Sequence, residues 1–396
     1  MTTRAGVGFS SLTSSVEAGR AAAQTAHDKL DGKAAELVLV FASSNHRYAE
    51  LLPAVRAVLG TTAPLVGCST AGEFTQDAVG HGAVVVMAIA SDAIRFRAGF
   101  GQGLKATREK AVADALRGFR DEHRAARAAG FMHATCIVCS DGLAGRGEDI
   151  VEAVHAESGM LAQVVGGAAA DDAKFERTDV FFGAETHTDA LAVVYAFSRS
   201  PIGLGVRHGL NAGCASMIVT RATDNVIHEI DGKPALVAYE RYAASLGEPF
   251  TEKTREAFMI THEIGMLTPL GEYKIRAPLK ANADGSIVMA SEVPAGSSIS
   301  MMKGTADGLV AAAELAARSA LANLAGARPA AVLVFDCICR RIFLGEGYKR
   351  QVDAFRSVVG PDVPIAGWET YGEIALTPSQ QSGWHNSTTV VAILPH

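Results

Sequence analysis

The segment PLVGCSTAGEF at residues 64–74 recurs near the other end of the chain as PIAGWETYGEI at residues 364–374. Each copy follows an apolar run and a helical stretch, and each precedes another apolar run. Both copies share the pattern G-x-x-x-x-G-E, which argues against a chance similarity of two unrelated βα units. Self-similarity of this kind indicates a fold built from repeated units.

A weaker third copy occupies the middle of the chain, where ATCIVCSDG is followed by a helical stretch, VVGGAAADD and DALAVVYAF. Each unit reads as strand, helix, short strand, polar Gly-rich loop and strand. Continuous Val/Ile/Leu runs are typical of strands that covering helices bury on both faces of a sheet. We therefore predict a mixed α/β (α+β) fold of repeated strand-helix-strand-loop-strand units, which form buried sheets flanked by helices, with antiparallel strand insertions.

Amphipathic or Ala-rich spacing predicts the helices. They are expected at residues 15–30, 47–59, 105–128, 148–157, 233–246, 305–325 and 347–359. Residues 201–235 and 273–303 instead alternate like antiparallel strands joined by tight turns, such as Asp284-Gly285. A boundary in the first of these regions divides the chain into an N-terminal module, residues 1–225, and a C-terminal module, residues 226–396.

The chain has 396 residues, 48% of them apolar and 20% charged, which is the composition of an ordinary globular protein. With 36 basic and 42 acidic residues, it has no bulk charge that attracts nucleic acid. The longest apolar run, residues 82–90, is too short to span a bilayer, and the first residues lack the apolar segment of a signal peptide. We therefore expect a cytoplasmic protein that binds neither nucleic acid nor a membrane.

Six cysteines are too few for a disulfide scaffold. Cys136 and Cys139 have C-x-x-C spacing, but residues three apart on a strand point to opposite faces of a sheet. We therefore interpret them as buried small hydrophobic residues rather than as a metal or redox pair. Cys337 and Cys339, in FDCICRR, also lie in an apolar segment.

The repeated Gly-rich loops are the first candidates for a ligand site, because ligands usually bind where the strands of a sheet end. The candidates in the two loops are Cys68, Ser69, Thr70, Glu73, Trp368, Thr370 and Glu373. The two glutamates could meet a ligand ammonium group, or they could bind backbone N–H groups and hold the loops. Turn chemistry in quasi-symmetric positions is therefore the alternative to a pocket.

Two further segments carry residues suited to a small ligand. Arg340, just past a buried strand, could clamp a carboxylate, or it could be a solvated strand end with surface ion pairs. Trp384, His385 and Asn386 precede the last strand, where an aromatic side chain beside polar groups suits a small-molecule pocket. Core packing under a loop is the alternative for this segment.

The sequence contains no recognisable catalytic motif. The first loop lacks the G-x-S-x-G pattern, because Ala71 stands where the last glycine is required. Neither H-E-x-x-H nor C-x-x-C-H occurs. We therefore expect that the chain is not an enzyme. A histidine within hydrogen-bonding reach of Cys68 or Ser69 would instead favour an enzyme that uses this loop for acyl or amide chemistry.

Taken in order, the segments PLVGCSTAGEF, PIGLGVRHG, EIDGKPAL, VLVFDCICR, GWETYGEIA and HNSTTVV resemble FIST-domain sensory proteins over about residues 37–393. The resemblance implies an N-terminal and a C-terminal FIST module in tandem, signal reception, and a small ligand such as an amino acid. No kinase, methyl-acceptor or cyclase segment is left over, so it implies a stand-alone sensor. Similar stand-alone proteins, the NosP group, are haem-based nitric oxide sensors that act on a partner histidine kinase, in a two-component system, or on cyclic-di-GMP metabolism.

If the chain is such a sensor, its haem would be of the b type, because the covalent attachment motif C-x-x-C-H is lacking. The iron needs an axial side chain in an apolar pocket, and the candidates are His262 and His208. Each could equally be a structural residue. The expected partners are a small-molecule or gas ligand and the kinase or cyclic-di-GMP enzyme, and the chain could form a homodimer. The alternatives are a haem-free sensor of amino-acid-like molecules, the enzyme described above and a passive scaffold.

Overall fold

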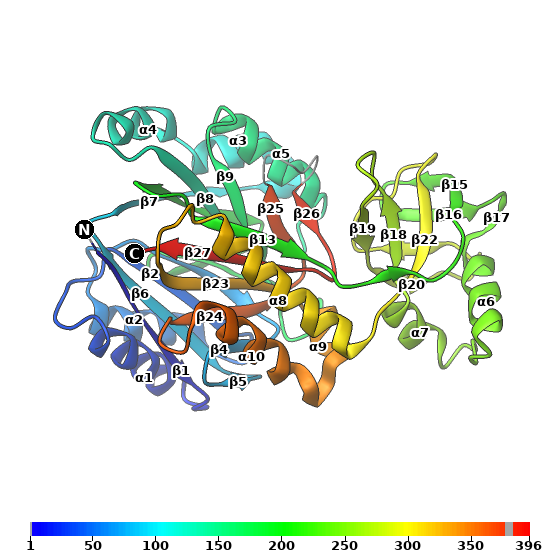
Figure 1. Ribbon diagram of the computed structural model, residues 1–396, viewed down its shortest axis with the longest axis horizontal. Helices are drawn as coiled ribbons and strands as arrows, with labels where there is room; N and C mark the ends of the chain where they lie inside the picture. Colours follow the sequence, from blue (N-terminus) through cyan, green and yellow to red (C-terminus); the bar gives the residue numbers. More distant parts are fainter. Residues whose placement is uncertain (1, 377–382) are drawn as a thin grey trace.

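The computed structural model describes residues 2–376 and 383–396, which fold into a three-sheet body and a separate inserted module (Figure 1). The body contains three mixed sheets of six strands each, and the inserted module contains a nine-stranded sheet. The inserted module comprises residues 208–305, between strand β13 and helix α8.

The three sheets of the body have equivalent strand orders. The first sheet has the order β1 (Thr3–Ser10), β6 (Val84–Ser91), β2 (Leu37–Ser43), β3 (Leu65–Thr70), β10 (Val180–Phe182) and β11 (Glu185–His187). The second has the order β7 (Ile94–Gln102), β12 (Ala190–Ser198), β8 (His133–Ser140), β9 (Gln163–Ala168), β25 (Glu373–Leu376) and β26 (Trp384–His385). The third has the order β13 (Gly203–Arg207), β27 (Thr389–Pro395), β23 (Pro329–Cys337), β24 (Ile365–Thr370), β4 (Glu73–Thr75) and β5 (Val79–Gly80).

Strand direction repeats as well. In each sheet the third and fourth strands of this order are parallel, and every other pair of neighbours is antiparallel. The parallel pair is joined by a crossover that contains a helix, as parallel strands require. The common order and direction confirm the predicted repeats and the mixed fold class.

The last two strands of each sheet come from a different repeat. The β10–β11 hairpin of the second repeat completes the first sheet, and the β25–β26 hairpin of the third repeat completes the second sheet. The β4–β5 hairpin of the first repeat completes the third sheet. The exchange is a closed cycle, so each sheet of the body needs another repeat for completion.

Helices cover the outer face of each sheet. The first sheet carries α1 (Ser15–Asp28) and α2 (Tyr48–Leu59), the second carries α3 (Leu104–Ala115), α4 (Phe119–Ala128) and α5 (Gly147–Glu157), and the third carries α8 (Ala306–Ala322) and α10 (Tyr348–Val359). Between β23 and α10 lie α9 (Ile338–Leu344) and a 3-10 turn (Gly345–Gly347). No helix in the described residues is long and apolar enough to cross a membrane. The cytoplasmic location stays a prediction.

The single helix predicted over residues 105–128 is wrong, because α3 and α4 are separate. Gly118 lies between them with a φ of 81°, a left-handed conformation that a continuing helix does not contain. Glycine in this conformation commonly ends a helix. The apolar periodicity continues across the break, which is why sequence spacing alone joined the two helices.

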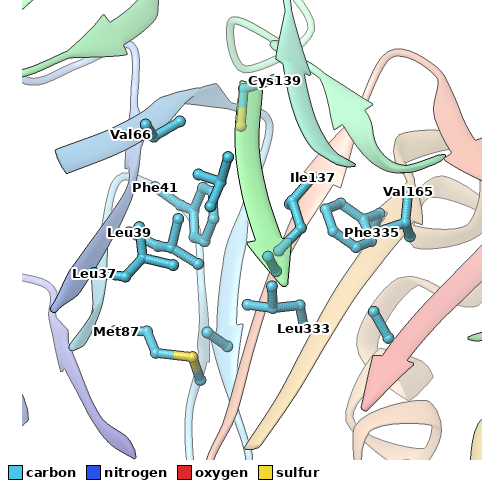
Figure 2. Close-up of a cluster of buried hydrophobic side chains, with 14 of the residues drawn as sticks. Leu37, Leu39, Phe41, Val66, Met87, Ile137, Cys139, Val165, Leu333 and Phe335 are labelled. Carbon is cyan, nitrogen blue, oxygen red and sulfur yellow. The ribbon is translucent and has the colours of Figure 1, made fainter. Parts of the chain in front are cut away.

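The inner faces of the three sheets meet in one hydrophobic core (Figure 2). Phe41, Ile137 and Phe335, one from each sheet, all lie in it and are at most 2% exposed. Because helices bury the opposite faces, the central strands are apolar along their whole length. Cys139 faces this core and Cys136 faces the helices, so the two thiols lie on opposite faces of the sheet as predicted.

The first strands of the repeats, β1, β7 and β13, carry a repeated G-x-G pair that the loop motif does not reveal. A Cβ atom on Gly8, Gly101 or Gly205 would lie 2.0, 1.8 or 1.9 Å from a backbone carbonyl oxygen of α1, α3 or α8 respectively. No side chain fits at such a distance. The glycines therefore let each covering helix pack directly on the strand backbone.

The inserted module interrupts the third repeat. Its strands are β14 (Asn211–Ala212), β15 (Met217–Thr223), β16 (Val226–Ile230), β17 (Lys233–Pro234), β18 (Ile264–Leu267), β19 (Tyr273–Arg276), β20 (Pro278–Ala281), β21 (Ile287–Met289) and β22 (Ser298–Lys303), and its helices are α6 (Ala235–Leu246) and α7 (Arg255–Thr261). Its strands pair in antiparallel fashion, in agreement with the predicted insertions. The body takes strands from both sides of the predicted boundary between residues 225 and 226, and that boundary stays a prediction.

Gly101→Ala should destabilise the protein by about 1–3 kcal/mol, the usual cost of overpacking. Its Cβ would lie 1.8 Å from the Ala111 carbonyl oxygen and force β7 away from α3. Urea unfolding measures the change. Gly347→Ala is the matched control, because no atom lies within 4 Å of its added Cβ, and its effect should stay under about 0.5 kcal/mol. Equal losses in the two variants would contradict the close packing of strand on helix.

Candidate functional site

The two repeated loops lie against each other at the carboxyl ends of parallel strands. The Ala71 N–H donates to the Glu369 carbonyl oxygen at 3.0 Å, and the Glu369 N–H donates to the Gly72 carbonyl oxygen at 2.8 Å. This contact follows from the hairpin exchange, because β4 of the first repeat pairs with β24 of the third. The two loops therefore form one joined structure rather than two independent sites.

Glu73 and Glu373 hold these loops in place. Each carboxylate accepts a hydrogen bond from a threonine three residues earlier, Thr70 or Thr370, and another from a distant backbone N–H. Both side chains are fully buried, and desolvation raises the pKa of Glu73 to about 8 and the pKa of Glu373 well above its usual value. Of the two alternatives for the loop glutamates and threonines, the structure supports turn chemistry.

Three further loop candidates face the interior. The Cys68 thiol lies in the central core against Cys139, and burial raises its pKa well above the usual value. The Ser69 hydroxyl accepts the Asp179 N–H at 2.9 Å and so anchors the exchanged β10 strand. Trp368 is fully buried and stacks on Phe41 with the ring centroids 3.7 Å apart. In the described residues no histidine bonds to Cys68 or Ser69, so the condition for a nucleophile in this loop is not met.

Arg340 is a buried structural cation rather than a free clamp or a solvated strand end. Its side chain is 1% exposed and lies 3.1 Å from the Asp336 carboxylate. It also donates to the Gln351 side chain and to the carbonyl oxygens of His208 and Leu309. These contacts engage all three guanidinium nitrogens, so the structure gives no support to Arg340 as a clamp for a ligand carboxylate.

A cleft of about 660 Å³ separates the body from the inserted module. Val206 and His385 line it from the body side, and His208 lines it at the point where the chain enters the inserted module. Residues 266–275, which form the β18–β19 hairpin, line it from the inserted module. The cleft is therefore the place where a bound molecule would touch both parts of the chain.

Charged side chains join the two parts beside this cleft. Lys274 Nζ and Arg276 Nη2 of β19 lie 2.8 and 3.1 Å from one Glu148 carboxylate oxygen on α5. Both cations are less than 10% exposed. Burial, and then repulsion by Arg276, lower the pKa of Lys274 to about 8. Two buried cations thus share this carboxylate, and an anionic group entering the cleft would be favoured beside Lys274.

The three candidate histidines occupy different environments. His385 and His208 line the cleft, and burial lowers their pKa values to about 3 and about 4, so both are neutral at physiological pH. His262 instead packs inside the inserted module, with its ring centroid 4.2 Å from that of Phe258. It lines neither the cleft nor the cavity described next, so the structure gives no support to His262 as a haem ligand.

Trp384 and Asn386 line a second cavity, of about 110 Å³, between the second repeat, the third repeat and the inserted module. Trp384 Nε1 donates to the Ser291 hydroxyl at 2.9 Å, and that hydroxyl donates to Asn386 Oδ1 at 3.1 Å. The segment of residues 384–386 therefore borders both hollows at the module contact. Its three candidates lie together there, beside the end of the third-repeat loop, because β26 pairs with β25 and His385 lies opposite Glu373.

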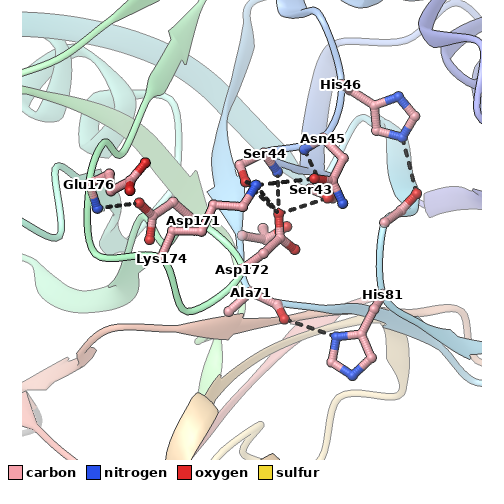
Figure 3. A network of polar contacts seen from close by, with 12 residues as sticks. Ser43, Ser44, Asn45, His46, Ala71, His81, Asp171, Asp172, Lys174 and Glu176 are labelled. Carbon is pink, nitrogen blue, oxygen red and sulfur yellow. Dashed lines mark hydrogen bonds and ion pairs between the residues drawn. The ribbon is translucent and has the colours of Figure 1, made fainter.

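A polar network beside the first loop was not predicted from the sequence (Figure 3). Asp172 accepts hydrogen bonds at 2.8 Å from the Ser43 hydroxyl and from the Ser44 N–H. Lys174 Nζ lies 2.8 Å from the Ser44 hydroxyl oxygen, and a cavity of about 370 Å³ adjoins these residues. The sequence feature that could have indicated this network is S-S-N-H at the end of a buried strand, at the edge of the sheet where parallel strands end.

Comparison with known proteins identifies two domain families along the chain. The FIST N domain matches residues 36–233, and the FIST C domain matches residues 235–376. An uncharacterized protein of Methanocaldococcus jannaschii is 27% identical over 152 residues, which are 35% of this chain and 29% of that protein. The match thus spans less than a third of that relative's length.

Two solved structures of cyanuric acid hydrolases, one of them from A. caulinodans, align with the whole chain at 11% identity, with TM-scores of 0.36 and 0.28. Beside these hydrolases, the prediction that the chain is not an enzyme is not upheld. Likeness at this level assigns neither their fold in detail nor their reaction to this chain.

Glu73→Gln should weaken the dependence of stability on pH. The folded-state pKa of Glu73, about 8, is raised above its usual 4.5, so the stability it contributes is present below pH 4.5 and is lost as the pH rises through about 8. In that window one such group changes the free energy of unfolding by up to about 1.4 kcal/mol per pH unit. Urea unfolding at pH 6 and pH 8 should show a smaller loss for the variant. Glu185→Gln, at an exposed position, should behave like the unmodified protein, and a wild-type pH dependence in Glu73→Gln would refute the assignment.

Proposed function

The chain belongs to the FIST family, and from that membership we propose that it is a sensory protein whose small ligand binds in the cleft between the body and the inserted module. The observation that carries the proposal is the cleft itself, whose volume of about 660 Å³ lies within the range of ligand pockets. The walls of the cleft come from the body and from the inserted module. A bound ligand can therefore change the contact between these two parts.

The electrostatics of the cleft favour a ligand with a carboxylate or another anionic group. Lys274 lines the cleft, while Arg276 lies behind it, and the two share the Glu148 carboxylate. A ligand anion beside Lys274 would compete with Glu148, which sits in the first turn of α5. Binding would thereby weaken the link between α5 and β19, and this is the step by which we propose that the ligand changes the arrangement of the two parts.

We further propose that the occupied sensor acts on a histidine kinase or on a cyclic-di-GMP enzyme. The support for this step is the resemblance to stand-alone FIST sensors. Since a sensor of this kind must signal through a contact that the ligand alters, the link between α5 and β19 is the natural source of the change.

A thermal-shift screen with the twenty amino acids and a panel of small dicarboxylates tests the site. A ligand present at 100 times its Kd should stabilise the folded protein by about 2.7 kcal/mol. Lys274→Met and Tyr273→Ala, both in the cleft wall, should abolish the shift. Leu315→Ala, at an exposed position on α8, is the matched control and should keep it. A shift that persists in both cleft variants would place the ligand elsewhere.

A more specific version of this proposal is that the cleft binds haem. The cleft is lined by two histidines that could coordinate the iron. His385 suits the iron best: its Nε2 faces the Ala375 carbonyl oxygen at 3.0 Å and so carries the proton, which leaves a lone pair on Nδ1. In His208, Nδ1 accepts the Leu210 N–H, so the proton lies on Nε2 and a change of tautomer is needed first. A haem b bound there would supply a coordination position for a gas such as nitric oxide.

An absorption spectrum of the protein supplied with haemin tests whether the cleft binds haem. A stoichiometric Soret band should develop and should shift when nitric oxide is added. His385→Ala should abolish the band, whereas His262→Ala, the control inside the inserted module, should keep it. Melting curves of both variants establish that each is folded. A colourless protein, or a band that needs His262 and not His385, would refute haem binding in the cleft and leave the carboxylate ligand to the thermal-shift screen.

A further inference from the structure

Cys337 and Cys339 lie side by side where β23 passes into α9. Cys339 lines one cavity together with Cys337, and it lines a second, smaller hollow together with Glu263 of the inserted module. Glu263 is 2% exposed and also accepts the Ser387 hydroxyl. Two thiols of the body, the Glu263 carboxylate of the inserted module and the Ser387 hydroxyl of the body therefore lie close together where the two parts touch.

Both thiols also line the cavity of about 110 Å³ that Trp384 borders. One water molecule takes up about 30 Å³ in the liquid, so this cavity has room for a small molecule beside the two cysteines. Cys339 is partly exposed, whereas Cys337 is buried. A molecule in the cavity therefore meets Cys339 as the more open of two adjacent thiols, with a carboxylate on its other side.

We propose that Cys337 and Cys339 form a redox-active dithiol, in which Glu263 deprotonates Cys339 and a small hydroperoxide that enters the cavity oxidises the pair to a disulfide. This site goes beyond ligand sensing in the cleft and does not depend on it.

The chemistry balances with hydrogen peroxide as the oxidant. Glu263 takes the proton of the Cys339 thiol, and the thiolate attacks one peroxide oxygen, which breaks the O–O bond and gives a sulfenic acid. The leaving hydroxide takes up the proton from Glu263 and becomes water. Cys337 then attacks the Cys339 sulfur, its proton joins the departing hydroxyl as a second water, and the S–S bond forms. Two thiols and one peroxide thus yield one disulfide and two waters.

The surroundings assign the two thiols their roles. Burial raises the pKa of Glu263 to about 7, which suits a general base at neutral pH. Burial and the contact with Cys339 hold the pKa of Cys337 well above its usual value, so Cys337 stays protonated and acts second. Elsewhere burial raises the pKa of Cys136 to about 12, and Cys68 lies in the central core, so neither competes.

The reduced full-length protein, treated with hydrogen peroxide under native conditions and then denatured and alkylated, tests the proposal by mass spectrometry. The peptide that contains Cys337 and Cys339 should be two hydrogens lighter and unalkylated, while Cys68 and Cys136 are alkylated. Cys337→Ser should stop at a sulfenic acid on Cys339 that dimedone traps. Cys214→Ser, which removes the partly exposed thiol of the inserted module, is the matched control and should form the disulfide at the wild-type rate.

The rate of disulfide formation tests the role of Glu263. In the unmodified protein it should rise as the pH passes through about 7, and Glu263→Gln should slow it at least about tenfold and remove that rise. The pH profile of the unmodified protein needs no variant, so it tests the role of Glu263 as the base even if Glu263→Gln unfolds. Full alkylation of Cys337 and Cys339 after peroxide treatment, or oxidation of Cys214 at the same rate, would overturn the proposal.

Discussion

The exchange of hairpins among the three repeats is the constraint on which the rest of the structure depends. Each repeat supplies four strands and a crossover helix to one sheet, yet the last two strands of that sheet come from another repeat. Backbone groups at the edges of β3, β9 and β24 are paired only through this exchange. Because the cycle closes, the inner faces of the sheets are held together around one apolar core. A repeat on its own would leave both an open edge and an apolar face exposed to water.

This constraint also determines what the repeated loops do. Glu73 and Glu373 stand at the starts of exchanged strands, and their buried carboxylates accept hydrogen bonds that fix the turn before each strand. A carboxyl group held in this way, without water, favours its protonated form. The most conspicuous sequence motif is therefore part of the joint between repeats, and the larger cleft lies elsewhere, where the inserted module meets the body.

The inserted module contacts the body because it lies between β13 and α8, two elements of the same repeat. Its β19 strand approaches α5 of the second repeat, and Glu263 approaches the end of β23 in the third. Hollows of about 660 and 110 Å³ result, and each is lined by residues from both parts. Changes in either hollow therefore act on the same contact, which gives a bound ligand and an oxidised dithiol a common route to the rest of the protein.

The sequence by itself determined the repeats, the buried strands and most of the helices, because apolar periodicity and the Gly-rich loops are local properties of the chain. It also placed Cys136 and Cys139 on opposite faces, since alternation along a strand is fixed by backbone geometry. Only the tertiary structure decided that Arg340 and Trp368 are buried, that His208 and His385 share one cleft, and that Glu263 meets Cys339. The partners lie far apart along the chain: Arg340 donates to the carbonyl oxygen of His208, 132 positions away, and Ser387 donates to Glu263, 124 positions away. Their pairing follows from how the three sheets and the inserted module pack together, and no local pattern in the chain records that packing.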